Sequence, residues 1–301
     1  MMNATTYADA VREMTRQLES AYTQQEAKTL ALRLFSSRLG VPEYACWTDA
    51  DKPVSEAIWA QWCGDVLQLL RHRPWQYVVG EAYFDGHSFL VNEAVLIPRP
   101  ETEELVRLAA DRVERRWGSR VSWLDVCTGS GCIAWSLAAR FPEASVCAVD
   151  WSQAALSLAA HQPISSEECP VRSPFFLRAD VLQGVPEDLM QETNLPAPGT
   201  WTALVSNPPY VRVSERDQMA ASVLDYEPEM ALFVPDEDPL LFYRALMDWA
   251  KVLLCPGGQV FWEINEALGE DLCAMLRSEG FRAVELLEDF RGRPRFVLFE
   301  K

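Results

Sequence analysis

The stretch VSWLDVCTGSGCIAWSLAARFPEASVCAVD, residues 121–150, decides the fold of this 301-residue chain. It contains an apolar strand, Val121 to Val126, a glycine-bearing turn, a helix through Ala134 to Arg140 and a second apolar strand, Ser145 to Asp150. Two strands joined by a helix pair in parallel, because the crossover returns the chain to the same end of the sheet. The segment therefore predicts an α/β protein.

The same alternation continues towards the C-terminus. Further strand-like runs are PFFL (174–177), TALVSN (202–207) and QVFWEI (259–264). Strands this continuously apolar predict an open parallel sheet with helices on both faces, which binds its ligand at the carboxyl ends of the strands. Two last runs, 282–287 and 295–300, are joined by the turn-like DFRGRP. This hairpin should place one antiparallel strand at the edge of the sheet.

The N-terminal part has a different character. Val11, Met14 and Leu18 recur at helical spacing, and no strand pattern interrupts the first 73 residues. Residues 74–98 are rich in turn and strand signals, including Asp85-Gly86. We therefore expect a helical domain over residues 1–73, a linker β-hairpin over 74–98 and a catalytic domain over 99–301.

Composition narrows the class of protein. The chain has 44 acidic and 27 basic residues, a formal net charge of −17, which disfavours binding to a phosphate backbone and favours a basic protein partner; the charge could also serve only solubility. No apolar run is long enough to span a bilayer. The eight cysteines form no C-x-x-C pair, so a metal site is not expected. We expect a cytoplasmic monomer that binds neither nucleic acid nor membrane.

The turn after the first strand is a candidate cofactor site. Gly129 and Gly131 let the backbone approach a ligand, but they also fit the dinucleotide fingerprint, so a nicotinamide or flavin enzyme stays an alternative here. Asp150, nineteen positions after Gly131, could bind both ribose hydroxyls of an adenosine or simply cap a helix. Trp151 could cover the adenine or pack in the core, and Asp180 could accept the adenine amino group or be an ordinary surface residue.

The segment Asn207-Pro208-Pro209-Tyr210 follows an apolar strand and points to the chemistry. The prolines remove backbone donors and hold Asn207 extended at the strand end. A planar NH₂ attacks a sulfonium methyl only when its lone pair is aimed, and the Asn207 side-chain oxygen and the Pro208 carbonyl could each accept one N–H to aim it. Tyr210 would press its ring on the planar group. Hydride transfer has no use for such acceptors, so methyl transfer displaces the dehydrogenase alternative.

Four motifs resemble those of the release-factor glutamine methyltransferases, over roughly residues 73 to 301. They are RPWQYVVGEAYF (73–84), VLIPRPETEELV (95–106), LDVCTGSGC (124–132) and LVSNPPYV (204–211). The resemblance implies a class I S-adenosylmethionine-dependent methyltransferase: a Rossmann-like sheet of seven strands with the last antiparallel, preceded by a small helical bundle that grips the release factor.

The resemblance also implies residue roles. The cofactor's methionine part would lie against Cys127, Thr128, Gly129, Ser130 and Gly131, its ribose against Asp150, and its adenine against Asp180 and Val181. Asn207 to Tyr210 would hold the glutamine of a Gly-Gly-Gln loop in bacterial-type release factors. The sequence departs from the family pattern at Cys127, where a glycine is usual, and at residues 234–244, which lack a glycine commonly found before the leucine.

Three other functions remain open. A sister enzyme methylates a glutamine of a ribosomal protein, although PRPETE (98–103) is atypical of that group. An adenine-amino DNA methyltransferase uses the same tetrad on a flipped base, against which the acidic charge argues. A noncatalytic adaptor would bind the cofactor and release factor only, and the intact Asn207 argues against it.

Overall fold

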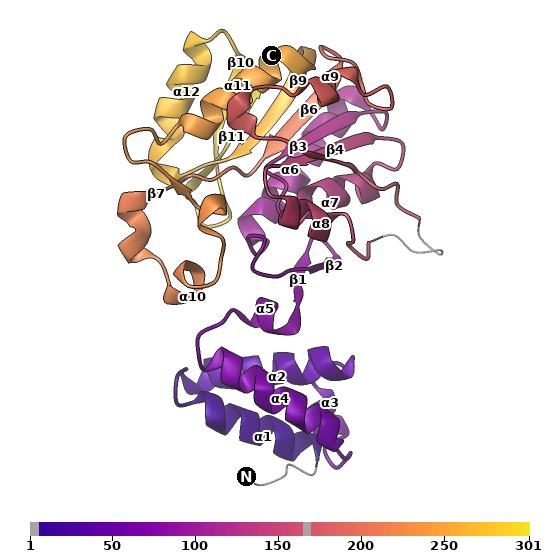
Figure 1. The fold of residues 1–301 in the computed structure, drawn as a ribbon, viewed down its shortest axis with the longest axis vertical. Helices are drawn as coiled ribbons and strands as arrows, with labels where there is room; N and C mark the ends of the chain where they lie inside the picture. The colour runs from indigo at the N-terminus through magenta and orange to yellow at the C-terminus, as the bar shows by residue number, and fades with distance from the viewer. Residues whose placement is uncertain (1–5, 165–169) are drawn as a thin grey trace. The chain divides into compact units, whose positions relative to one another are not determined.

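A computed structural model describes residues 6–164 and 170–301 of the chain (Figure 1). The chain divides into two compact units. One comprises Met1–Glu81 with Ala220–Tyr226, and the other Ala82–Met219 with Glu227–Lys301. The division at 81/82 differs from the predicted boundaries at 73/74 and 98/99, and the later segment that joins the helical unit has no counterpart in the predicted domains.

The first unit is helical, as its periodicity predicts. Its helices are α1 (Tyr7–Leu18), α2 (Gln24–Leu39), α3 (Ala45–Thr48), α4 (Glu56–Leu69), α5 (Trp75–Val79) and α10 (Ala221–Leu224). The side chain of Thr23 caps α2, and Gly40 ends it in the left-handed conformation. Arg38 ties the unit together, because its guanidinium lies 2.9 Å from the Asp65 carboxylate and donates to the Val78 carbonyl at 2.7 Å.

The segment 220–226 belongs to this unit although it lies far along the chain. The Tyr226 hydroxyl donates to the Arg71 carbonyl at 2.8 Å. The sequence of this segment does not predict its contact with the helical unit, because α10 has only four residues and the segment is only weakly apolar.

The second unit contains a seven-stranded sheet with the order β10-β11-β9-β6-β3-β4-β5. Its strands are β3 (Ser122–Val126), β4 (Ser145–Asp150), β5 (Phe175–Arg178), β6 (Trp201–Ser206), β9 (Leu254–Glu263), β10 (Arg282–Glu288) and β11 (Pro294–Glu300). Strands β5, β4, β3, β6 and β9 run parallel. The predicted α/β fold with seven strands, the last of them antiparallel, is confirmed.

The C-terminal hairpin corrects one prediction. The antiparallel strand was expected at the sheet edge, but β11 lies between β9 and β10 and pairs antiparallel with both. The edge is therefore β10, whose side chains are mostly half-buried or exposed. The burial patterns agree with this order, since β11 carries four consecutive buried residues and β10 carries none.

Helices cover the two faces of this sheet. They are α6 (Pro100–Trp117), α7 (Cys132–Arg140), α8 (Gln153–Ala159), α9 (Glu187–Gln191), α11 (Leu241–Leu253) and α12 (Gly269–Ser278). Short pairs complete the unit: β1 (Glu81–Phe84) with β2 (His87–Leu90), and β7 (Val211–Arg212) with β8 (Phe233–Val234). None of the helices in the described parts of the chain is long and apolar enough to cross a membrane.

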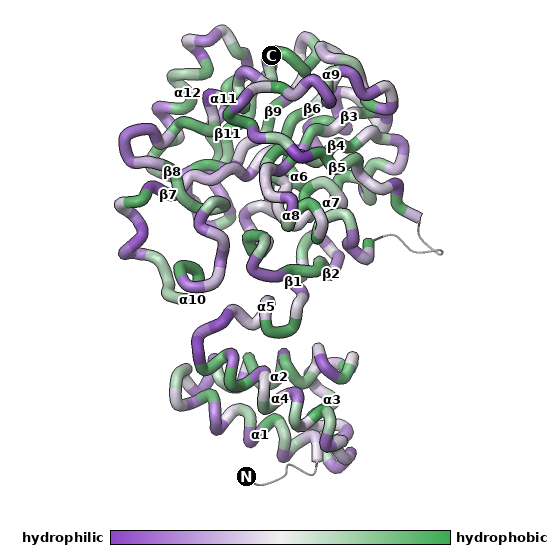
Figure 2. Tube along the Cα trace, viewed as in Figure 1, coloured by the Kyte–Doolittle hydropathy of each residue, from purple (hydrophilic) through white to green (hydrophobic). Residues whose placement is uncertain are grey.

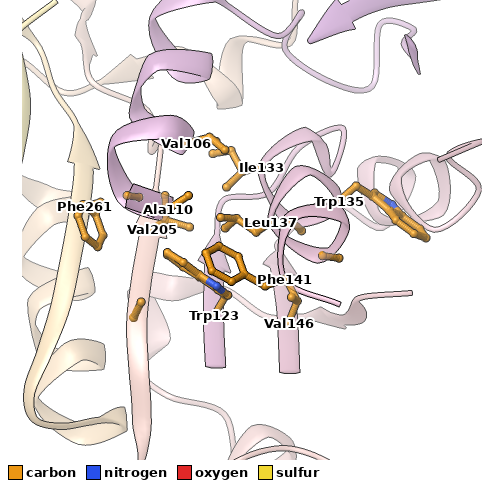
Figure 3. Close-up of a cluster of buried hydrophobic side chains, with 14 of the residues drawn as sticks. Val106, Ala110, Trp123, Ile133, Trp135, Leu137, Phe141, Val146, Val205 and Phe261 are labelled. Carbon is orange, nitrogen blue, oxygen red and sulfur yellow. The ribbon is translucent and has the colours of Figure 1, made fainter. Parts of the chain in front are cut away.

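Alternation along the strands builds two cores. Trp123, Val205 and Phe261 face α6 and α7, as Figure 3 shows. Phe84 and Phe89 of the β1–β2 hairpin belong to the same core. Their strand neighbours, such as Leu124 and Leu204, face α11 and α12 on the other side. The hydrophobic colouring of the central strands in Figure 2 follows from burial on both faces. This rigid sheet fixes the loops at its carboxyl edge.

Candidate active site

A cavity of about 420 Å³ opens at the carboxyl ends of β3, β4, β5 and β6. That volume is in the range of small-molecule sites. Nine of the ten predicted cofactor residues line it: Cys127, Thr128, Gly129, Ser130, Asp150, Trp151, Asp180, Val181 and Asn207. Gly131, the tenth, is not among the described residues that line the cavity. The sheet thus gathers the predicted residues at one edge.

Asp125, on β3, holds the turn that follows this strand. This carboxylate is fully buried and accepts from the Thr128 hydroxyl at 2.6 Å and the Ala134 N–H at 3.1 Å. Burial raises the pKa of Asp125 to about 7. Cys127 lies in the left-handed region with φ +64°, a conformation that explains why glycine is usual at this position. Burial also raises the pKa of the Cys127 thiol, so it packs as a neutral apolar group.

The two glycines of the turn have different surroundings. A Cβ on Gly129 would meet no protein atom within 4 Å, so this glycine leaves open space beside the cavity. A Cβ on Gly131 would lie 3.0 Å from the Ala159 Cβ and 3.2 Å from the Trp135 Cδ1. Gly131 therefore permits close packing of α7 against α8.

Asp150 ends β4 at the rim of the cavity. One of its oxygens accepts from the Gly129 N–H at 2.9 Å, and the other from the Ser152 N–H at 2.8 Å. Burial raises the pKa of Asp150 despite these bonds. A carboxylate has about four acceptor positions, so both oxygens retain capacity for further donors. The neighbouring Trp151 is 52% exposed, and the guanidinium of Arg178 lies 4.8 Å from its ring centroid.

Asp180 and Val181 follow β5 and line the same cavity. Asp180 caps the short 3₁₀ turn Val181–Gln183 by accepting from the Leu182 N–H at 3.0 Å. The Val181 side chain is buried, and its carbonyl accepts from the Trp249 indole N–H at 3.2 Å. Both positions are thus fixed by the fold.

Asn207 directly follows β6, and it lines the cavity together with Pro209. The Asn207 amide nitrogen donates to the Thr102 hydroxyl oxygen at 2.9 Å. Within the described part of the chain, no group donates to the Asn207 side-chain oxygen or to the Pro208 carbonyl. Two acceptors therefore remain in the segment that was predicted to orient a planar amide.

Tyr210 and Pro208 are not among the described residues that line the cavity. The Tyr210 hydroxyl donates to the Glu263 carboxylate at 2.9 Å, and its ring packs beside the core on the α11 side of the sheet. Burial raises the pKa of Tyr210 well above its ordinary value. The tyrosine is thus anchored behind the segment, with its hydroxyl directed into the protein.

Two buried carboxylates near the site were missed by the sequence reasoning. Glu227 accepts from the Ile97 N–H at 3.1 Å and from the Arg99 guanidinium at 2.5 Å, which fastens the segment before α6. Glu263, at the end of β9, accepts from Thr102 and Tyr210. The sequence signals for Glu263 were weak. Its partner Thr102 lies inside the PRPETE motif without an assigned role, and Glu263 itself is a single acidic residue in an apolar strand.

Comparisons with known proteins identify the relatives of this chain. Residues 9–80 match the family described as the PrmC N-terminal domain. A protein of Bacteroides thetaiotaomicron named release factor glutamine methyltransferase is 37% identical over 284 residues, covering 93% of this chain and 95% of that one. A relative of the same name from Streptococcus pneumoniae is 32% identical, over 100% of this chain and 99% of its own.

The chain belongs to the release factor glutamine methyltransferase family.

A third relative, from Flavobacterium psychrophilum, is 41% identical over 79% of each chain. Among solved structures, a release factor-specific protein-(glutamine-N5) methyltransferase from Alicyclobacillus acidocaldarius is 28% identical, with a TM-score of 0.42, over 71% of this chain and 99% of that one. Family membership confirms the recognition made from the four motifs. It also favours a protein methyltransferase over the dehydrogenase and the DNA methyltransferase alternatives.

Proposed function

We propose that this protein transfers a methyl group from S-adenosylmethionine to the side-chain amide nitrogen of the glutamine in the Gly-Gly-Gln motif of a translation release factor. The observation that carries the proposal is the placement of Asn207: it lines the cavity, and its amide nitrogen is already bonded to Thr102. The family of the chain supports the same reaction.

The cavity suits the cofactor. Its volume of about 420 Å³ accommodates a nucleoside with an amino-acid tail, the turn at Gly129 leaves open space, and Asp150 has acceptor capacity for ribose hydroxyls. We assign Cys127, Thr128, Gly129 and Ser130 to the methionine part, and Asp180 and Val181 to the adenine. We assign the exposed Trp151 to the adenine face. The cofactor supplies an electrophilic methyl group on a sulfonium.

The chain's own residues aim the acceptor nitrogen. The Asn207 side-chain oxygen and the Pro208 carbonyl each accept one N–H of the glutamine amide, which turns its lone pair towards the methyl carbon. These oxygens also stabilise the positive charge that develops on nitrogen as the N–C bond forms and the S–C bond breaks. The bonding pair would stay with the sulfonium sulfur, and the nitrogen would then lose a proton to water.

We assign the helical unit, predicted over residues 1–73, to recognition of the release factor. The sequence of residues 9–80 matches the PrmC N-terminal domain family. The net charge of −17 favours encounter with a basic partner protein. A cytoplasmic monomer, as inferred from the sequence, would meet release factors where translation takes place.

A panel of substrates tests the proposal. The full chain is incubated with S-adenosylmethionine carrying a labelled methyl group and, in parallel, with a release factor, a mixture of ribosomal proteins and adenine-containing duplex DNA. We expect label in the release factor alone. Label in a ribosomal protein would support the sister activity instead, and label in DNA would overturn the assignment to a protein substrate.

A further inference from the structure

Glu263 is a buried carboxylate whose two oxygens are both occupied by hydroxyl groups of the active-site segments. Its exposed fraction is 1%, one oxygen accepts from the Thr102 hydroxyl at 2.6 Å, and the other from the Tyr210 hydroxyl at 2.9 Å. An ionised carboxylate accepts hydrogen bonds and donates none. With Glu263 ionised, both hydroxyl protons therefore point at its carboxylate.

This arrangement fixes the direction of the next hydrogen bond. A threonine hydroxyl has one proton, and that of Thr102 is given to Glu263. Its oxygen can consequently only accept from Asn207, 2.9 Å away. The flipped amide would place the Asn207 oxygen against the Thr102 oxygen with no proton between them. Because Thr102 is 3% exposed, no bulk water relieves that repulsion.

We propose that Glu263 and Thr102 are positioning residues for Asn207. The hydrogen bonds from Asn207 to Thr102 and from Thr102 to Glu263 select the amide orientation in which the Asn207 oxygen, and not its nitrogen, is presented to the substrate. This inference rests on the proposed function, and it assigns Glu263 and Thr102 a role that they exert through Asn207.

Groups around Glu263 shift its pKa in opposite directions: burial raises the pKa, and the hydrogen bonds from Thr102 and Tyr210 oppose that rise. Arg295 on β11 donates to the carbonyl of Ile264, the next residue, and its positive charge opposes the rise in the pKa of Glu263 that burial causes. Glu101 on α6 raises the pKa further by repulsion. Tyr243 on α11 donates its proton to the Glu263 backbone carbonyl, at 2.9 Å, and not to its carboxylate.

Substitution of Thr102 tests the assignment. Thr102→Val keeps the shape of the side chain and removes the hydroxyl, whereas Thr102→Ser keeps the hydroxyl. Thr202→Val is the matched control: it lies at the start of β6 and removes a hydroxyl that bonds the Ser122 N–H and carbonyl at 2.8 and 2.9 Å, far along the strand from Asn207.

We expect kcat to fall roughly 10- to 100-fold in Thr102→Val, because the amide of Asn207 can then turn over, while the KM for the release factor and the affinity for S-adenosylmethionine stay within about threefold. Thr102→Ser should restore kcat to within about threefold of the wild type. A kcat of Thr102→Val equal to that of Thr202→Val would overturn the proposal, as would failure of Thr102→Ser to rescue.

A measurement without substrate separates this proposal from the proposed function. In protein labelled with ¹⁵N-asparagine, the side-chain NH₂ signal of Asn207 is identified by its loss in Asn207→Ala. We expect one of its protons to be protected from exchange in the wild type and in Thr102→Ser, and unprotected in Thr102→Val. Equal exchange in all three would refute the hydrogen-bond chain, whatever the protein methylates; conversely, a wild type that methylates no release factor would refute the function alone.

Discussion

The two glycines of the cofactor turn should respond differently to substitution by alanine. Gly131→Ala forces a Cβ into a residue with φ +79°, 3.0 Å from the Ala159 Cβ and 3.2 Å from the Trp135 Cδ1. The left-handed backbone costs about 1–2 kcal/mol, and the overpacking about 1–2 kcal/mol more. Gly129→Ala, at φ +55° with open space around the Cβ, carries only the first cost. Gly131→Ala should therefore lower the free energy of unfolding by about 2–4 kcal/mol.

Urea unfolding and calorimetry measure the two effects. With a slope of about 3 kcal/mol/M, Gly131→Ala should lower the unfolding midpoint by roughly 1 M, about twice the shift of Gly129→Ala. In the folded protein, Gly129→Ala should weaken S-adenosylmethionine binding more than Gly131→Ala, because only Gly129 lines the cavity. Equal loss of stability in the two variants, or wild-type cofactor affinity in Gly129→Ala, would refute this division of roles.

Three further results are expected. Asn207→Ala should lower kcat roughly 10²- to 10³-fold through loss of one acceptor while calorimetry finds cofactor affinity within about threefold, and loss of cofactor binding would contradict the assignment. With both substrates saturating, kcat should fall as the pH is lowered through the pKa of Glu263, which burial raises. The reason is that protonated Glu263 can donate to Thr102 and so reverse the direction of the hydrogen bonds. A kcat that stays constant down to about pH 4.3, the ordinary pKa of a glutamate, would count against this prediction. Deletion of residues 1–73 should raise the KM for the release factor while cofactor affinity changes little, and equal loss of both would indicate a purely structural role.

Local patterns in the sequence predict most of the sheet and the cofactor edge. β4 begins and ends at the residues expected, and the other predicted strands shift by only a few residues, apart from β9, which begins five residues before its predicted start. Such strands are recognisable because burial on both faces requires continuous apolar runs. The carboxyl ends of parallel strands meet at one edge, so Gly129, Asp150, Asp180 and Asn207 could be grouped from their positions after the predicted strands.

Contacts between distant segments were not predictable in this way. Thr102 and Glu263 are 161 positions apart, and each is unremarkable in its own local pattern. The hairpin motif predicts that β10 and β11 pair with each other, but it does not predict which of the two strands also pairs with β9. Gly131 fits a ligand-binding fingerprint, yet its environment is set by Ala159 on the next helix.

The central claim is that the Asn207 oxygen and the Pro208 carbonyl hold a glutamine amide for methylation. Its most direct test is fragmentation mass spectrometry of a release factor after reaction with the full chain and S-adenosylmethionine bearing a deuterated methyl group. The account predicts the label on the side-chain nitrogen of the Gly-Gly-Gln glutamine, and no label when this residue is replaced by asparagine, whose shorter side chain withdraws the amide. A label on any other residue, or one that persists after the replacement, would contradict it.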